Sequence, residues 1–536
     1  MKNLFIYTFL VFLYGCANVQ APTGGDKDVI PPTLEVAVPK NFSVNFKSKK
    51  IVLVFDEYFS FSNLQSIIVT PKIDLKDKIK QRKKRLEITL PDSLLPNTTF
   101  TINFGESIKD INEGNILKNF SYVFSTGTYL DSLSIGGKIV TALENTPQKG
   151  VGVYLYEVKE SDTVIYHKQP TYFTKTLEDG IFSINNLPEQ EYKIFTLNDK
   201  NNNYIFDNFE EEIGFIDTSI ILKKSLTLNP IYLFASQNPD KKINKVALNK
   251  DGSIFISLTQ PPNSKPKIEI LFPSEINSKY QKITEFDSIL FWIDPIINDS
   301  INFNLTIPEW NLDTNITTRN INTIEKNKIN SFNLKSNIVG NRLKPNSSLI
   351  LTSEKPFKLW DSTGFTFTVD SQALKIETNT SNKLNNQLII NNLYKTNTKY
   401  KLNIPDSTVA DIYGNYNTIS EFNFQIFDKT ELGTLKLNLD PKYLNSNNYI
   451  IELIKISSKI KTHQINTSTL KRKFIYLENL MPGKYKIQII QDSNNNKSWT
   501  TGNLITGKQP ELVRKLSEPL EIRPNWDLEI EINFMF

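Results

Sequence analysis

Apolar and polar residues alternate along most of this 536-residue chain, in short runs separated by turn residues. Val, Ile, Thr and aromatic residues dominate the runs, and Asn, Asp, Pro and Gly separate them. Clear examples are residues 51–55, 86–90, 100–104, 365–369 and 435–439. A period of two is typical of half-buried β-strands, and strands at this spacing are typical of β-sandwiches. No long helical pattern interrupts them, so the sequence predicts an all-β chain of tandem sandwich domains.

One segment near the N-terminus departs from the alternation, because residues 4–14 form a continuous apolar run. This run is shorter than the ~20 residues of a membrane-spanning helix, but it suits the core of a secretory signal. It leads into residues 13–16, Leu-Tyr-Gly-Cys, which resemble the lipobox of bacterial lipoproteins, although Tyr14 is bulky for that motif. The resemblance implies that residues 1–15 are a signal peptide and that Cys16 carries the lipids, palmitate among them.

Lipidation of Cys16 would anchor the mature protein to outer-membrane lipid. Residues 16–33 are rich in Pro, Gly and Asp and are expected to form a flexible tether. The sequence does not show which face of the outer membrane the protein occupies. The acidic cluster that marks surface-exposed lipoproteins of the Bacteroidota does not directly follow the cysteine here. The alternative is a simple export signal with an incidental cysteine. Cys16 is the only cysteine, so a disulfide scaffold is excluded.

An internal repeat divides the rest of the chain. Residues 186–203 recur as residues 479–496, with a tyrosine and an aspartate each matched 293 positions later. This indicates two copies of one domain, at residues 130–235 and 432–536. The motif Asp-Gly-x-Phe-x-Ile, followed by Asn-Leu-Pro and Tyr-Lys-Ile, resembles sandwiches of the transthyretin-like or carboxypeptidase-regulatory-like type.

A second, looser pair matches residues 95–126 with residues 395–424. Both carry an aspartate before a Gly-Asn turn, where glycine permits a positive φ, and both end in an aromatic strand. These features resemble the bacterial Ig-like domains of S-layer and other envelope proteins. They imply an Ig-like domain at 34–127 and a divergent one at 336–428. Residues 236–335 are also rich in predicted strands, and we expect a further sandwich of unknown type there.

Composition narrows the function classes. Lys plus Arg is 62 and Asp plus Glu is 57, so the net charge of +5 is nearly balanced, and nucleic acid is not expected as a partner. The two histidines, His167 and His463, lie far apart, and no nucleophile or phosphate-loop motif is present. We therefore expect a protein that is not an enzyme. A carboxylate-based glycan hydrolase is the enzymatic alternative, because one sequence does not reveal which carboxylates meet.

The sharpest chemical pattern lies in the first copy of the repeat. Oxygen-bearing residues fall at the ligand positions of a calcium loop of the EF-hand type: Asp199, Asn201, Asn203, Ile205 through its carbonyl, Asp207 and Glu210. Tyr204 occupies the sixth position, where that loop prefers glycine. The second copy keeps Asp492, Asn494 and Asn496 but has Thr500 and Asn503 at the last two positions, so a weaker site is expected. The alternative for both is an Asn/Asp-rich turn whose side chains bond their own backbone.

Scattered Asp-Ser/Thr-apolar tripeptides, and two similar Asp-Ser-Thr sites, resemble the O-glycosylation sequon of exported Bacteroidota proteins. The candidate hydroxyls are Ser93, Ser132, Thr163, Ser288, Ser300, Ser362 and Ser407. Ordinary turns explain each of them equally well. Residues 78–85 hold six Lys and Arg residues, which suit either contact with anionic headgroups or glycans, or a solvated hairpin.

The order of lipobox, tether and sandwiches resembles a group of Bacteroidota outer-membrane lipoproteins with an N-terminal Ig-like domain. The expected function is a non-catalytic envelope lipoprotein that binds or scaffolds. It would be an accessory subunit of an outer-membrane assembly for protein insertion, export or uptake, with an envelope protein as partner. The alternative is a surface adhesin or glycan-binding protein.

Overall fold

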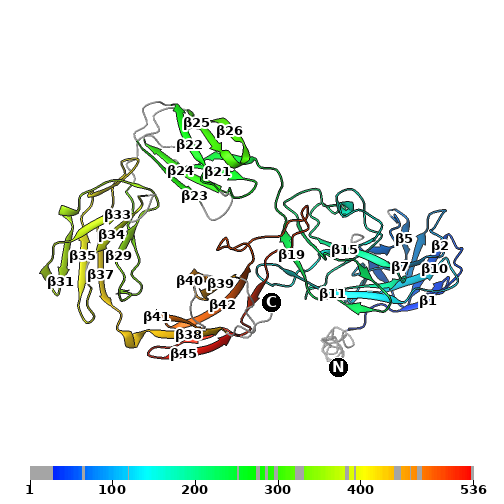
Figure 1. Ribbon diagram of the computed structural model, residues 1–536. Coiled ribbons are helices and arrows are strands. Elements are labelled where there is room, and N and C mark those ends of the chain that lie inside the picture. The colour runs from blue at the N-terminus through cyan, green and yellow to red at the C-terminus, as the bar shows by residue number, and fades with distance from the viewer. Residues whose placement is uncertain are drawn as a thin grey trace, which may run out of the picture. The chain divides into compact units, whose positions relative to one another are not determined.

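Strands make up nearly all the regular structure of the chain in its computed structural model (Figure 1). The structure describes residues 28–532 except 63–66, 76, 119, 250–252, 263, 273–277, 284–287, 295–299, 320–330, 381–384, 392–393, 440–447, 459 and 467–473. The helices within these residues are single 3₁₀ turns, η2 (Val164–Tyr166), η3 (Pro308–Trp310), η4 (Ser362–Gly364) and η5 (Lys429–Glu431). The predicted all-β class of tandem β-sandwiches is confirmed. No helix in the described part is long and apolar enough to span a bilayer.

The first sandwich packs three small sheets around an aromatic core. The sheets run β1-β2-β6-β5, β10-β7-β4 and β3-β8-β9. In β2 every second side chain is fully buried, as the alternating sequence predicts, and Phe100 and Phe124 stack with ring centroids 5.3 Å apart. The strands are β1 (Leu34–Val38), β2 (Lys50–Phe55), β3 (Phe59–Phe61), β4 (Ile68–Thr70), β5 (Ile79–Arg82), β6 (Arg85–Thr89), β7 (Thr99–Asn103), β8 (Ile108–Asp110), β9 (Ile116–Leu117) and β10 (Ser121–Ser125).

The second sandwich is built from one continuous nine-stranded sheet that folds over its own core. Its main path is β13-β12-β15-β16-β19-β11-β14, with β17 paired to β15 and β18 paired in parallel to β11. Val153, Tyr192 and Leu233 are among its fully buried side chains. The strands are β11 (Leu133–Thr141), β12 (Gly152–Glu157), β13 (Tyr172–Lys175), β14 (Ile181–Leu187), β15 (Glu191–Leu197), β16 (Glu212–Phe215), β17 (Ile220–Ile221), β18 (Leu226–Thr227) and β19 (Ile231–Ala235).

The third sandwich, for which the sequence shows no family resemblance, has two antiparallel sheets, β20-β21-β24-β23 and β22-β25-β26. Their facing sides bury Ile256, Phe291 and Phe303. The strands are β20 (Ile243–Leu248), β21 (Ile254–Leu258), β22 (Lys267–Phe272), β23 (Ser278–Ile283), β24 (Ser288–Asp294), β25 (Ser300–Ile307) and β26 (Leu312–Arg319).

The fourth sandwich has sheets β27-β29-β34-β33, β28-β37-β35-β31-β32 and β30-β36. Phe332 and Leu334 pack with its core, so this core begins a few residues before residue 336. The strands are β27 (Lys335–Ser336), β28 (Arg342–Leu343), β29 (Leu349–Thr352), β30 (Phe357–Trp360), β31 (Thr366–Val369), β32 (Gln372–Ala373), β33 (Glu377–Thr380), β34 (Gln387–Asn391), β35 (Tyr400–Ile404), β36 (Val409–Asp411) and β37 (Ser420–Ile426).

The fifth sandwich has sheets β41-β38-β45 and β40-β39-β42-β43, with β44 also paired to β42. Its last strand joins β38 in parallel and places Leu528 and Ile530 against the core. The strands are β38 (Gly433–Leu439), β39 (Asn448–Lys455), β40 (Ile460–Asn466), β41 (Phe474–Leu480), β42 (Gly483–Asp492), β43 (Val513–Lys515), β44 (Leu520–Ile522) and β45 (Asp527–Ile532).

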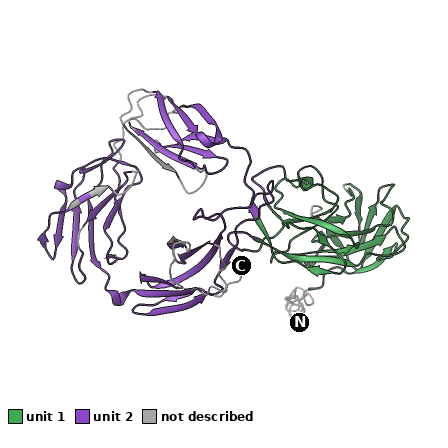
Figure 2. Cartoon of the chain, viewed as in Figure 1, with its two compact units in different colours: residues 1–140, 146–207, 213–233 green, residues 141–145, 208–212, 234–536 purple. Residues whose placement is uncertain are grey.

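The chain divides into two compact units (Figure 2). Unit 1 holds residues 1–140, 146–207 and 213–233, and therefore the first two sandwiches. Unit 2 holds residues 141–145, 208–212 and 234–536, and therefore the other three.

A hydrogen-bonded corner explains why the repeat keeps its tyrosine and asparagine. The hydroxyl of Tyr192 donates to the Pro188 carbonyl at 3.1 Å, and that of Tyr485 donates to the Met481 carbonyl at 2.6 Å. In each copy, the asparagine six residues before the tyrosine takes the left-handed conformation, which asparagine tolerates. Its φ is 58° for Asn186 and 55° for Asn479. The corner fixes where the following strand begins, and with it the Asn/Asp-rich loop after that strand.

Candidate functional site

The first Asn/Asp-rich loop joins β15 to β16, which are neighbours in the sheet of the second sandwich. The carboxylate of Asp199 accepts the backbone N–H groups of Asn203 at 3.3 Å and Tyr204 at 2.7 Å. The side-chain oxygen of Asn201 accepts the Asn203 N–H at 3.0 Å, and that of Asn203 accepts the N–H of Ile205 at 2.8 Å. The predicted ligand positions one, three and five therefore all face the inside of one turn.

The carboxylate of Asp207 closes this turn. The side-chain amide of Asn203 donates to it at 2.6 Å, and that of Asn201 donates to both its oxygens at 3.3 Å. A calcium ion beside Asp207 would replace these two donors, which requires rotation of both amides so that their oxygens turn inward. These bonds within the loop also fit the alternative of a self-bonded Asn/Asp-rich turn.

Tyr204 takes the backbone conformation that the loop needs despite its side chain. Its φ of 65° lies in the left-handed region, where a calcium loop usually has glycine. The ring packs at a centroid distance of 5.0 Å from Phe173, and the ammonium of Lys72 lies 4.2 Å from its centroid. These contacts offset the backbone strain, so the departure from glycine does not prevent the turn.

Glu210, the expected twelfth ligand, falls in unit 2, whereas residues 199–207 belong to unit 1. Its backbone N–H donates to the side chain of Asn208 at 2.9 Å, and its side chain is exposed. Its role as a ligand stays a prediction.

The second loop, after β42, reproduces the first bond by bond. Asp492 accepts the N–H groups of Asn496 at 3.0 Å and Lys497 at 3.1 Å, and the Asn494 oxygen accepts the same Asn496 N–H at 3.0 Å. The amides of both asparagines donate to the hydroxyl of Thr500, which stands where Asp207 stands in the first loop. The two loops therefore share one fold and differ in the charge of the closing residue.

Glu511 belongs to the second loop and was missed by the sequence analysis. Its carboxylate accepts the N–H of Ser493 at 2.8 Å and that of Thr500 at 2.9 Å, and only 5% of the residue is exposed. It lies beyond the twelve-residue ligand window, on the loop segment that returns to β43, so ligand spacing gives no signal for it. It brings a second carboxylate to a loop for which the sequence predicts only Asp492.

Equivalent aspartates hold a turn in the first sandwich and a turn in the fourth. Asp110 accepts the backbone N–H groups of residues 112, 113 and 114 at 3.2, 2.6 and 3.3 Å. Burial alone would raise the pKa of Asp110, but these donors outweigh it and lower the pKa to about 2. Asp411 accepts the N–H groups of Tyr413 at 2.9 Å and Asn415 at 3.0 Å. The first copy has one more residue before its glycine than the second, and both glycines have a positive φ.

The charge beside this aspartate is reversed between the two copies. Phe59 pairs with Asp110 and Phe357 pairs with Asp411, so Glu57 and Lys355, each two residues earlier, are equivalent. The Lys355 ammonium lies 3.8 Å from an Asp411 carboxylate oxygen. Burial raises the pKa of Glu57, and the nearby carboxylates of Asp110, Asp56 and Asp28 raise it further.

The candidate glycosylation hydroxyls differ in access. Four are exposed: Ser93, Ser132, Thr163 and Ser407. Ser288 and Ser300 begin β24 and β25 and are half-buried, as is Ser362 in η4. Their modification stays a prediction, and Cys16 with residues 1–27 lies outside the described residues.

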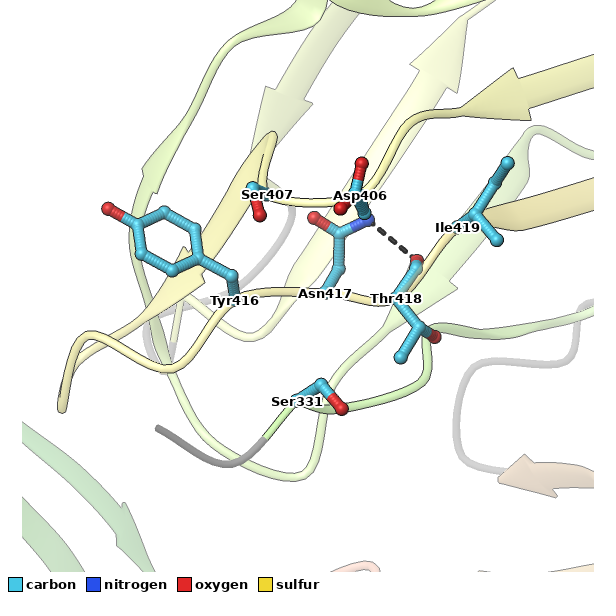
Figure 3. Close-up of a pocket in the computed structure, with 7 residues that line it drawn as sticks. All are labelled: Ser331, Asp406, Ser407, Tyr416, Asn417, Thr418 and Ile419. Atoms are coloured by element: carbon cyan, nitrogen blue, oxygen red, sulfur yellow. Dashed lines mark hydrogen bonds between the residues drawn. The ribbon is translucent and has the colours of Figure 1, made fainter. Parts of the chain in front are cut away.

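The fourth sandwich carries a surface pocket of about 470 Å³ (Figure 3). Asn417 is structural within it, because its side chain accepts the N–H groups of Thr408 and Val409 and donates to the Pro405 and Thr418 carbonyls. The Thr418 hydroxyl donates to the Asn333 side chain, whereas the Ser407 hydroxyl and the Tyr416 ring are exposed and could contact a ligand. The lining residues are Ser331, Asp406, Ser407, Tyr416, Asn417, Thr418 and Ile419. Within the described residues, no group of three or more His, Cys, Asp or Glu side chains is placed to hold a metal ion.

Residues 28–126 match the family of bacterial Ig-like domains. No curated protein matches the chain. The TIE protein of Bacillus anthracis is 10% identical, with 95% of this chain and 75% of that chain covered and a TM-score of 0.16. The major pilin subunit BcpA of Bacillus cereus is 10% identical, with 75% and 98% covered and a TM-score of 0.14. A DUF3823 family protein from Bacteroides uniformis is 10% identical, with 54% and 98% covered and a TM-score of 0.12. At TM-scores this low, only the Ig-like match contributes to the argument, and it identifies the first sandwich as Ig-like.

Proposed function

We propose that this chain is a lipid-anchored envelope protein that acts by binding, as a scaffold or accessory subunit of an outer-membrane assembly. The observation that carries the proposal is the combination of the lipobox at residues 13–16 with an Ig-like sandwich beginning a few residues after Asp28. The side chain of Asn115 donates to the carbonyls of Asp28 and Ile30, so the tether joins the sandwich there. The twelve residues from Cys16 to Asp28 reach ~40 Å at full extension, which keeps the first sandwich near the membrane.

Mass spectrometry of the mature N-terminus tests the anchor. We expect a protein that begins at an acylated Cys16 and partitions into detergent. Cys16→Ser should leave the folded sandwiches intact and remove that partitioning. An unmodified cysteine in a protein released with the soluble periplasmic fraction would contradict the anchor.

We further propose that the first Asn/Asp-rich loop binds calcium, supported by the convergence of Asp199, Asn201 and Asn203 on the turn that Asp207 closes. Calcium at one hundred times its dissociation constant would stabilise the folded state by about 2.7 kcal/mol. We expect added calcium to raise the melting temperature of the wild-type protein and to have no effect on Asp207→Asn. Asp492→Asn is the matched control in the weaker second loop, and it should keep most of the calcium response. A wild-type melting temperature that does not respond to millimolar calcium would contradict the proposal.

The second candidate function is glycan binding, which the pocket of the fourth sandwich favours. Tyr416 is 39% exposed beside the hydroxyl of Ser407, and an exposed aromatic ring with polar neighbours suits a sugar face. We expect Tyr416→Ala to abolish retention on envelope glycans, with Tyr476→Ala, an exposed ring in the fifth sandwich, as the control. Retention that is unchanged by Tyr416→Ala would exclude this pocket as the glycan site.

A further inference from the structure

The outer face of the sheet β1-β2-β6-β5 is divided into an apolar half and a basic half. Leu53, Leu86 and Ile88 point into the core and are fully buried, so the residues between them face outward. Strand register places these outward residues in two rows across the sheet. One row is Val38, Val52, Glu87 and Lys80, and the other is Val36, Val54, Arg85 and Arg82.

The apolar half of this face consists of valines whose side chains are partly or largely exposed. Val36 is 48% exposed and Val38 is 57% exposed on the edge strand β1, and Val52 and Val54 beside them are half-buried. Isolated exposed apolar residues are ordinary, but a contiguous group that borders a charged strip is typical of an interaction surface.

The basic half continues into the hairpin that joins β5 to β6. Lys78, Lys80, Arg82 and Lys83 are exposed. In the described part of the chain, the ion pairs of this region are those of Glu87, with Lys50 at 2.5 Å and Arg85 at 3.1 Å. The exposed carboxylate of Asp92 also interacts with Lys78, so two carboxylates stand against the strip of cations.

Two features of the hairpin cost stability in isolation. Arg82 lies directly opposite Arg85, and like charges at facing positions repel each other. Lys83, in the two-residue turn, has φ 55°, a conformation for which such turns favour asparagine or glycine. Local strain and repulsion that persist in a folded protein point to a function that needs those side chains.

The hairpin tip lies at the end of the sandwich where the tether enters. The backbone N–H of Phe55 donates to the Lys84 carbonyl at 2.9 Å, and the next N–H, that of Asp56, donates to the Thr33 carbonyl at 3.0 Å. The Asp56 carboxylate accepts the N–H of Thr33 at 2.8 Å, and the Lys84 ammonium donates to the Asp56 carbonyl. Thr33, from which the chain leads back to Cys16, and Lys84, at the basic tip, therefore bond two adjacent residues.

We propose that this face, Val36, Val38, Lys78, Lys80, Arg82 and Lys83, binds the phosphate-bearing headgroups of the membrane that holds the lipid of Cys16. The proposal rests on the proposed lipid anchor for its location. Anionic headgroups complement the excess of cations in this strip, and the valines beside it suit the boundary between headgroups and acyl chains. The entry point of the tether favours a membrane over a soluble partner, because it brings this end of the sandwich to the lipid surface.

Flotation with lipid vesicles tests the surface without the anchor. The probe is the chain from residue 17 onward, which keeps every described residue and lacks the lipid. We expect it to float with vesicles that contain phosphatidylglycerol and not with phosphatidylcholine alone. The binding should be lost at high salt, because salt screens exposed charges.

The quadruple change Lys78→Gln, Lys80→Gln, Arg82→Gln and Lys83→Gln is expected to lower the vesicle partition coefficient by roughly several hundredfold, since each cation contributes a factor of about five. The matched control removes four exposed lysines elsewhere: Lys223→Gln, Lys224→Gln, Lys484→Gln and Lys508→Gln. It changes the net charge equally and should leave binding within about twofold.

A single change separates binding from folding. Lys83→Gly relieves the left-handed strain, so we expect a higher melting temperature together with weaker vesicle binding. Equal binding to both kinds of vesicle, or equal losses in the quadruple variant and its control, would overturn the proposal. So would retention on an acidic polysaccharide without vesicle binding, which would assign the surface to a glycan. Each of these results is independent of whether Cys16 is acylated.

Discussion

At the scale of single residues, buried carboxylates hold equivalent turns in the first and fourth sandwiches. The turn in the first copy depends on Asp110, whose carboxylate binds three backbone N–H groups. The sequence predicts this turn from its aspartate and its Gly-Asn pair. It does not reveal the reversed charge at Glu57 and Lys355, because that equivalence depends on strand pairing rather than on a shared motif.

Replacing the carboxylate of Asp110 should flatten the acid response of the first sandwich. The folded pKa of about 2 lies below the value of ~3.9 in an unfolded chain, so ionised Asp110 favours the folded state. Its contribution is complete above about pH 4 and is lost as the pH falls toward 2. Asp110→Asn should be less stable at pH 7 and should lose less stability between pH 4 and 2. Denaturant unfolding at several pH values measures this, and parallel curves for wild type and variant would contradict it.

Reversing the charge at Glu57 should stabilise the first sandwich. Glu57→Lys would copy the Lys355–Asp411 arrangement and remove repulsion between carboxylates. We expect the free energy of unfolding to rise by less than about 1 kcal/mol, because the site is partly solvated. Lys355→Glu is the reciprocal variant and should lower the stability of the fourth sandwich. A Glu57→Lys protein that unfolds at lower denaturant would show that the two turns are not equivalent.

At the scale of elements, the repeated corner and the loop after it form one unit that occurs twice. The sequence identifies both copies, because matched residues such as Tyr192 and Tyr485 keep the same spacing. The sequence does not reveal the contacts that complete each loop. Tyr204 adopts the turn through aromatic and cationic neighbours distant in sequence, and Glu511 joins the second loop from beyond the ligand window. Both depend on tertiary packing that local spacing does not encode.

Removing one hydroxyl should weaken each corner by a similar amount. Tyr192→Phe and Tyr485→Phe each delete a bond from a buried ring to a backbone carbonyl while keeping the packing. A hydrogen bond of this kind contributes about 1 kcal/mol net. Denaturant unfolding of both variants should therefore show equal losses. A loss confined to one copy would mean that the corners are not equivalent.

At the scale of the whole molecule, the large clusters of buried side chains form separate cores, and a small cluster of Trp292 with Ile412 joins the third and fourth sandwiches. Clusters around Leu53, Val153, Ile256, Leu402 and Leu437 each draw on one stretch of the chain. Alternating sequence patterns predict such cores, because every sandwich buries its own alternate residues. The pattern does not specify which surfaces the cores present to a partner.

Separate cores should unfold in more than one step. Calorimetry should show a transition broader than a single two-state unfolding event. Leu437→Ala, in the fifth core, should cost about 2–5 kcal/mol and lower one component only, and Leu53→Ala should lower a different one. One sharp transition that both variants shift equally would contradict this separation.

The most direct test of the central claim is purification of the tagged protein from gently solubilised outer membranes, followed by mass spectrometry of everything recovered with it. The proposed function predicts that the protein is extracted only with detergent, begins at an acylated Cys16 and is recovered with a stoichiometric envelope protein. A protein recovered alone, without detergent and with an unmodified cysteine, would contradict both the anchor and the accessory role.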